Sequence, residues 1–117
     1  MPRALEWAPI GARGSFAPWV HGLKGRSGVY LIRSDAGELL YVGESHTGRL
    51  YETITRHFQS WSGPTAGFTY DRGRTEVSIV LCPPAEAVDL QFEMIAEYQP
   101  RDNEVGKGLP ALEDVPF

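Results

Sequence analysis

The chain has 117 residues, which suits a single domain built around one hydrophobic core. No apolar run approaches the roughly 20 residues of a membrane span, and the N-terminus lacks the apolar segment of a signal peptide. We therefore expect an intracellular, cytoplasmic protein with no membrane partner. Cys82 is the single cysteine, which excludes an internal disulfide framework and a cysteine-based zinc site.

The net charge of −4 argues against strong non-specific binding to nucleic acid. The charge is unevenly spread, with eight Lys/Arg against five Asp/Glu in residues 13–74, but two against nine in residues 75–117. The first part can present a modest basic surface that attracts phosphates. Uneven surface charge is common, however, and does not by itself indicate nucleic-acid binding.

We expect a core over residues 27–103 between an N-terminal extension, 1–26, and a C-terminal extension, 104–117. Aromatic residues of the first extension should pack onto the domain. Hydrophobic periodicity predicts strands at about 28–33, 38–43 and 75–82, and helices at about 48–59 and 84–98, with a loop over 60–74. The order β-β-α-β-α indicates an α+β fold in which helices flank a small, three-stranded, mostly antiparallel sheet.

The first two strands carry related triplets, Gly28-Val29-Tyr30 and Tyr41-Val42-Gly43. The stretch between them is charged and contains glycine, which is typical of a hairpin turn. If Arg33 pairs with Glu38, Tyr30 lies directly opposite Tyr41.

Side chains alternate between the two faces of a strand, so both tyrosines would share one face with both glycines. That face would be an open floor, and the valine face would form the core. Most cross-strand aromatic pairs only pack, and the hairpin alone favours packing over catalysis.

Downstream elements extend the pattern. The first expected helix ends in Arg56-His57-Phe58, and Asn103 lies three residues after Pro100. Together with the two triplets, these features resemble the GIY-YIG nuclease superfamily over residues 27–103. The resemblance implies an endonuclease that hydrolyses DNA phosphodiester bonds with one divalent ion, Mg²⁺ or Mn²⁺.

The resemblance further implies that Tyr30 and Tyr41 lie at the reacting centre, with Tyr30 the preferred general base. A phenol with a pKa near ~10 is a poor base at neutral pH unless cations stabilise its anion. A metal ion or a guanidinium can do so, and can also stabilise charge on the phosphoryl oxygens.

Arg49 and Arg56 lie on one stripe of the first helix, beside its apolar face. The family places its catalytic arginine one turn before the helix histidine, which here is Thr53, so this chain departs from the pattern. We expect Arg49 to take over that role, with Arg56 as the second candidate. Both are also expected to contact DNA. Solvent exposure without function is the commoner fate of such arginines.

Two further arginines, Arg72 and Arg74, lie in the expected loop and are candidate DNA contacts. His57 lies at the centre of the apolar stripe. For His57, the role of a buried core residue and the role of an assistant in catalysis remain equally open.

Gln91 stands where the family has its metal-binding glutamate. It lies on the buried stripe of the second helix, where an unpartnered amide costs free energy. Neighbouring carboxylates point elsewhere around the helix, so none replaces it. A natural variant with weak metal affinity, an inactive relative and an introduced inactivating change all remain open. We expect Gln91→Glu to create or restore metal-dependent cleavage.

Asn103 matches a polar residue near the end of the family's domain. It can bond the backbone of a neighbouring strand, although a turn residue is the commoner role. Gly28 and Gly43 complete the structural motif.

Two other functions stay open: a catalytically inert nucleic-acid-binding module of the same fold, and a protein-interaction domain. For the nuclease, substrate choice on DNA would come from the 1–26 segment, the 60–74 loop, a homodimer or a partner protein.

Overall fold

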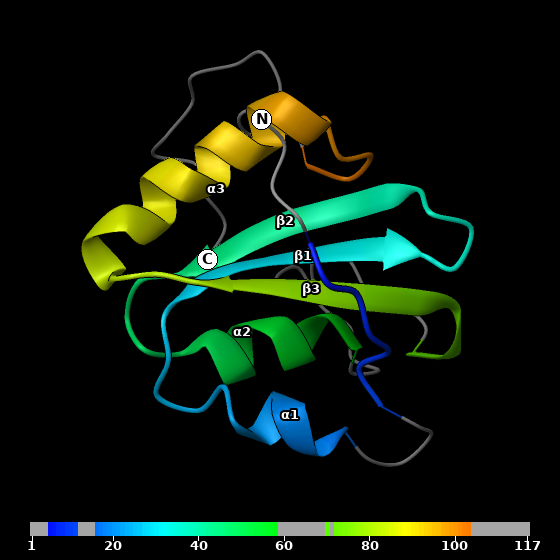
Figure 1. Cartoon of the computed structure of the whole chain (residues 1–117), viewed down its shortest axis with the longest axis horizontal. Helices are drawn as coiled ribbons and strands as arrows, with labels where there is room; N and C mark the ends of the chain where they lie inside the picture. The colour runs from blue at the N-terminus through cyan, green and yellow to red at the C-terminus, as the bar shows by residue number, and fades with distance from the viewer. Residues whose placement is uncertain (1–4, 12–15, 59–69, 71, 104–117) are drawn as a thin grey trace, which may run out of the picture.

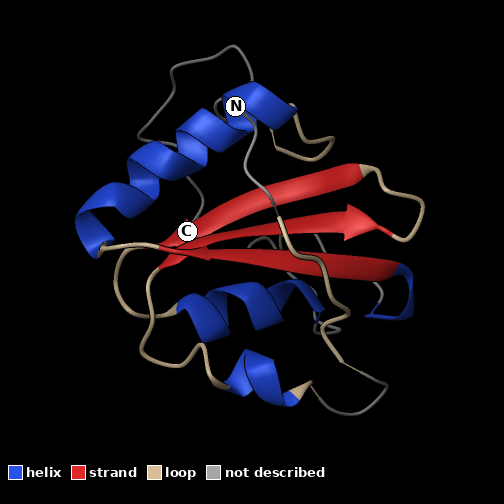
Figure 2. Cartoon of the chain, in the orientation of Figure 1, coloured by secondary structure: helices blue, strands red, loops and turns tan. Residues whose placement is uncertain are grey.

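The computed structural model describes residues 5–11, 16–58, 70 and 72–103. Its centre is an antiparallel three-stranded sheet made of β1 (Gly28–Ser34), β2 (Leu39–Ser45) and β3 (Thr75–Leu81). The strand order is β2-β1-β3, so β1 is central (Figures 1 and 2). The expected α+β class is confirmed, and the described strands all pair antiparallel.

Helices cover both faces of the sheet. On one side lies α3 (Pro84–Tyr98), which begins at a proline as expected because proline lacks the N–H that a first helical turn leaves unpaired. On the other side lie α2 (Leu50–Thr55) and α1 (Pro18–His21) (Figure 1). The helix expected over 48–59 is shorter than that: α2 passes into a 3₁₀ turn, η1 (Arg56–Phe58). A second 3₁₀ turn, η2 (Arg72–Arg74), leads into β3.

The hydrophobic core consists of two clusters, one on each face of the sheet. The cluster beneath α3 includes Val29, Leu31 and Val42. The cluster on the α2 side includes Tyr30 and Tyr41. The expectation of an open floor is therefore wrong, because Tyr30 is 0% exposed and Tyr41 is 3% exposed.

The expected hairpin register is also wrong. Tyr30 pairs with Gly43, and Tyr41 pairs with Ile32, so the two tyrosines are diagonal neighbours. The ladder shifts between Ile32 and Arg33, where Leu40 is an extra residue on β2. An extra residue of this kind is a β-bulge, which a pattern of alternating side chains cannot reveal.

The bulge also changes which face each leucine takes. Strict alternation would place Leu40 on the same face as Val42, but Leu40 packs in the tyrosine cluster, and Leu39 packs against the α3 cluster. The turn is closed by Ser34, whose N–H donates to the Glu38 carbonyl at 2.8 Å. Arg33 therefore faces Leu39 rather than Glu38.

The N-terminal segment lies along β3. Ala8 and Val77 exchange both backbone hydrogen bonds, at 3.1 and 2.8 Å, in an antiparallel bridge. The Arg33 guanidinium stacks on Trp7 at 4.4 Å, and Phe16 and Trp19 pack against the tyrosine cluster. Within the described residues, no helix is long and apolar enough to cross a membrane.

Candidate active site

Tyr30 reaches across the sheet toward β2 because Gly43 leaves room for it. A Cβ at position 43 would occupy the space of Cζ and Oη of the Tyr30 ring. Gly28 has a different role, since a Cβ there would meet the Val80 backbone carbonyl on β3 rather than a tyrosine. One glycine of the motif thus admits the tyrosine, and the other lets two strands approach.

The Tyr30 hydroxyl lies 2.8 Å from Nε2 of His57, and this hydrogen bond is buried. His57 is 2% exposed and comes from η1, directly after α2. Its ring centroid lies 4.7 Å from that of Tyr41, and the two tyrosine rings are 6.3 Å apart. The structure thus brings together Tyr30, Tyr41 and His57, and His57 is both a core residue and a polar partner.

Burial raises the pKa of the Tyr30 phenol well above its ordinary value, and the neighbouring Tyr41 and Glu44 charges raise it further. Arg56 acts in the opposite direction and lowers that pKa, but burial dominates. Burial also raises the pKa of Tyr41. Both phenols therefore hold their protons at neutral pH, and a neutral Tyr30 can donate its proton to an unprotonated Nε2 of His57.

The arginines of the sequence pattern occupy different places. The charge of Arg56 lowers the pKa of Tyr30, and Arg56 begins η1, the turn that carries His57. Arg49 is exposed at the N-terminal end of α2, where its N–H donates to Ser45 Oγ at 2.9 Å. No contact joins the Arg49 side chain to the tyrosine cluster in the described part of the chain. The expectation that Arg49, or second Arg56, takes the catalytic role stays a prediction.

The remaining DNA-contact candidates lie at the far end of the hairpin. Arg74 is exposed, and its carbonyl accepts a hydrogen bond from Asp35 N–H at 2.8 Å. Arg72 starts η2, but its side chain lies outside the described part of the structure.

Asn103 completes the outer edge of β2. Its Oδ1 accepts a hydrogen bond from Val42 N–H at 2.8 Å, and its Nδ2 donates to the Val42 carbonyl at 2.9 Å. The side-chain amide thus copies the pairing of a neighbouring strand at one residue. The bond to a strand backbone is correct, and the commoner role of turn residue is not the one Asn103 plays.

Gln91 is buried on α3, as expected, with 4% exposure. Its Nε2 donates weakly to the same Val42 carbonyl at 3.4 Å, while its Oε1 is buried and has no hydrogen-bond partner among the described residues. An orphaned buried carbonyl oxygen is costly, and it is also a ligand type that hard divalent ions accept. Gln91 therefore fits a divalent ion as a neutral ligand, although among the described residues no three His, Cys, Asp or Glu side chains converge on a metal position.

Three polar residues near the tyrosines were missed at the sequence level. Tyr70 donates its hydroxyl proton to Asp102 at 2.7 Å, and its ring lies 5.9 Å from that of His57. Burial, followed by the bond to Asp102, raises the pKa of Tyr70. Glu44 is 4% exposed directly after the Tyr41-Val42-Gly43 triplet. A charged residue inside a strand was the one available signal, and it pointed to Glu44.

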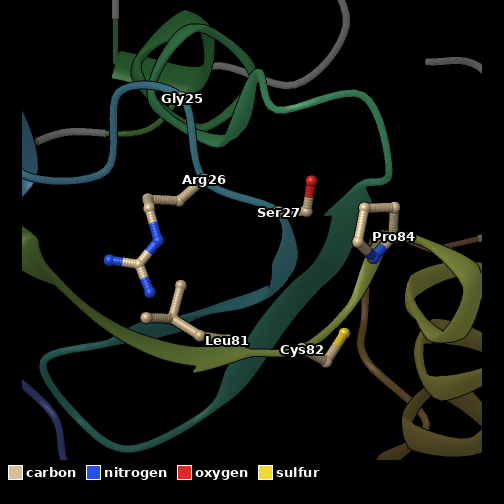
Figure 3. A pocket seen from close by; sticks show the side chains of 6 residues that line it. All are labelled: Gly25, Arg26, Ser27, Leu81, Cys82 and Pro84. Atoms are coloured by element: carbon tan, nitrogen blue, oxygen red, sulfur yellow. The ribbon is translucent and has the colours of Figure 1, made fainter.

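An open hollow of about 370 Å³ lies away from this site, where β1 begins and β3 ends (Figure 3). Arg26, Ser27, Leu81 and Cys82 line it, and its lining includes none of the tyrosines or His57. Comparison of the sequence with models of known protein families found no match, and a search among curated proteins found none either. The chemistry of the site must therefore be argued from its own residues.

Proposed function

We propose that this chain is a metal-dependent endonuclease of the GIY-YIG type that hydrolyses DNA phosphodiester bonds. The observation that carries the proposal is the buried hydrogen bond between Tyr30 Oη and His57 Nε2, with Arg56 close enough to act on the phenol. Packing alone does not require a histidine at 2% exposure to be paired with a tyrosine hydroxyl.

The raised pKa of Tyr30 makes simple ionisation an unfavourable route to a base. A relay avoids that cost. Water gives a proton to Tyr30 Oη while the phenol proton passes to Nε2 of His57, so the phenol remains neutral throughout. The resulting hydroxide adds to phosphorus, the bond to the leaving sugar oxygen breaks, and a solvent water protonates that oxygen. His57 then gives its extra proton to the hydroxide left in the solvent, which restores the relay.

Charge on the phosphoryl group increases during this attack. Arg56 is the cationic side chain beside Tyr30, and it stabilises that charge. A divalent ion, when bound, supplies further positive charge to the phosphoryl oxygens. Since Tyr30 is buried in the free chain, the proposal requires DNA binding to uncover its hydroxyl.

Cleavage of linear, supercoiled and branched DNA in Mg²⁺ or Mn²⁺ tests the proposal. We expect the unaltered chain or its Gln91→Glu form to cut at least one substrate. In the form that cuts, Tyr30→Phe and His57→Gln should each slow cleavage by about 10²-fold or more, because each breaks the relay. Tyr98→Phe, on α3 against the other cluster, is the matched control and should cut normally.

Two results would reject the nuclease proposal. One is salt-sensitive DNA binding with no cleavage by the unaltered chain or its Gln91→Glu form, which indicates an inert binding module. The other is no DNA binding even at low salt, which indicates a protein-interaction domain.

A further inference from the structure

Glu44 is a buried carboxylate that the relay does not use. It is 4% exposed, and a charged group at such depth costs free energy unless an opposite charge compensates it. Within the described residues its one polar partner is His46, whose Nδ1 lies 3.1 and 3.2 Å from the two carboxylate oxygens. The His46 side chain is 48% exposed, so solvent screens whatever charge it carries.

Strand alternation places Glu44 on the α3 side of the sheet. Glu44 pairs with Val29 across the ladder, and both Val29 and Val42 pack beneath α3. Glu44 lies two residues beyond Val42 on that face, a step of about 3.3 Å per residue. Gln91, on α3, donates to the Val42 carbonyl, and Glu44 follows Val42 by two residues along β2. The Gln91 amide and Glu44 are therefore separated by one two-residue repeat of the strand.

The two groups complement each other chemically. Among the described residues, Gln91 Oε1 is a buried oxygen with no donor, and Glu44 is a buried carboxylate whose one polar partner is half exposed. A divalent cation between them would satisfy both at once. Mg²⁺ commonly uses one or two carboxylates and keeps several waters, leaving positions for substrate phosphate oxygens.

We propose that Glu44 supplies the carboxylate of a divalent-cation site, with Gln91 Oε1 as its neutral ligand. The charge that a glutamate at position 91 would bring is thus moved to β2. Only its catalytic consequence rests on the proposed nuclease function; the cation site itself does not.

Mn²⁺ titration of the full chain without DNA, read by calorimetry and by loss of the free Mn²⁺ electron-spin signal, tests the site. We expect one ion per chain, and at least tenfold weaker binding by Glu44→Gln. Glu93→Gln is the control, because Glu93 is exposed on the outer side of α3, and it should bind as the unaltered chain does. Gln91→Glu should bind at least tenfold more tightly, because it adds a second carboxylate.

Gln91→Met keeps the test decisive if Glu44→Gln fails to fold. It preserves the side-chain shape and removes the orphaned oxygen, so the metal-free chain should melt at a higher temperature while Mn²⁺ binding weakens. Mn²⁺ affinity unchanged in Glu44→Gln or in Gln91→Met, or no binding by the unaltered chain at millimolar Mn²⁺, would overturn the proposal. Mn²⁺ binding that depends on Glu44, without DNA cleavage, would uphold the cation site and reject the nuclease. DNA cleavage together with Mn²⁺ binding that does not depend on Glu44 would uphold the nuclease and reject the cation site.

Discussion

Gly43 shows how one residue without a side chain determines the position of another. Tyr30 crosses to the β2 side of the sheet only because position 43 presents no Cβ beneath its ring. The hydroxyl is thereby brought to His57, and the register of the hairpin follows from the same contact. The glycine in the second triplet is therefore a packing requirement of the proposed site.

Gly43→Ala should destabilise the fold by about 1–3 kcal/mol, because the added methyl group overpacks against Tyr30. Urea denaturation gives the change in the free energy of unfolding. In a Tyr30→Ala background the clash partner is gone, so most of the penalty should vanish. An equal penalty in both backgrounds would show that the glycine is needed for another reason.

Among the elements, β2 has the most unusual edge. Two side chains, Asn103 after the last helix and Gln91 within it, meet the Val42 peptide group from outside the sheet. The backbone of the same terminal segment adds two bonds, from Arg101 to the Leu39 carbonyl and from Asp102 to the Leu40 carbonyl, at 3.1 and 2.8 Å. The edge strand that carries Tyr41 is thus held in place by the segment after α3.

Asn103→Ala should cost about 1–3 kcal/mol, because the buried Val42 N–H loses its acceptor and its carbonyl keeps only the weak bond to Gln91. Amide hydrogen exchange at Val42 should accelerate more than exchange in β3. Glu97→Ala, at an exposed position of α3, provides the control for an alanine substitution. Unchanged protection of Val42 would mean that the edge is held by the backbone bonds alone.

The elements were largely predictable, and their contacts were not. Strand β3 and helix α3 follow from alternation and from the Pro83-Pro84 start, which are local signals. The bulge at Leu40 depends on how β2 accommodates Tyr30 and the turn, so local periodicity could not reveal it. The burial of Gln91 followed from helical spacing, but its bond to Val42 joins residues 49 positions apart, a separation that local patterns do not reach.

On the scale of the whole molecule, the sheet is covered on both faces (Figure 2). The N-terminal segment was expected to pack onto the domain, and it does so over the tyrosine face, where Ile10 and Val20 are fully buried. Their cover turns the tyrosine face from a surface into a core. That change raises the pKa values of the phenols and favours a proton relay over a free phenolate.

Stability should consequently fall in alkaline solution. Tyr30, Tyr41 and Tyr70 all have pKa values raised by burial, whereas phenols in the unfolded chain ionise near pH ~10. Below that pH both states keep these protons, so the three tyrosines add no pH dependence. Above it the unfolded chain binds fewer protons than the folded chain, and each such tyrosine lowers the free energy of unfolding by about 1.4 kcal/mol per pH unit.

Urea denaturation at a series of alkaline pH values measures this slope, and three of the five tyrosines should form tyrosinate together with unfolding rather than before it. Tyr41→Phe removes one of the three phenolic protons while leaving the hydrogen bond between Tyr30 and His57 in place. It should therefore reduce the dependence of the unfolding free energy on pH by the contribution of one proton. Glu97→Gln should leave the slope unchanged, because Glu97 is exposed on α3 and carries none of the phenolic protons that set the slope. Tyrosinate absorbance that develops fully in the still-folded chain would contradict the buried tyrosine cluster, and with it the need for a relay.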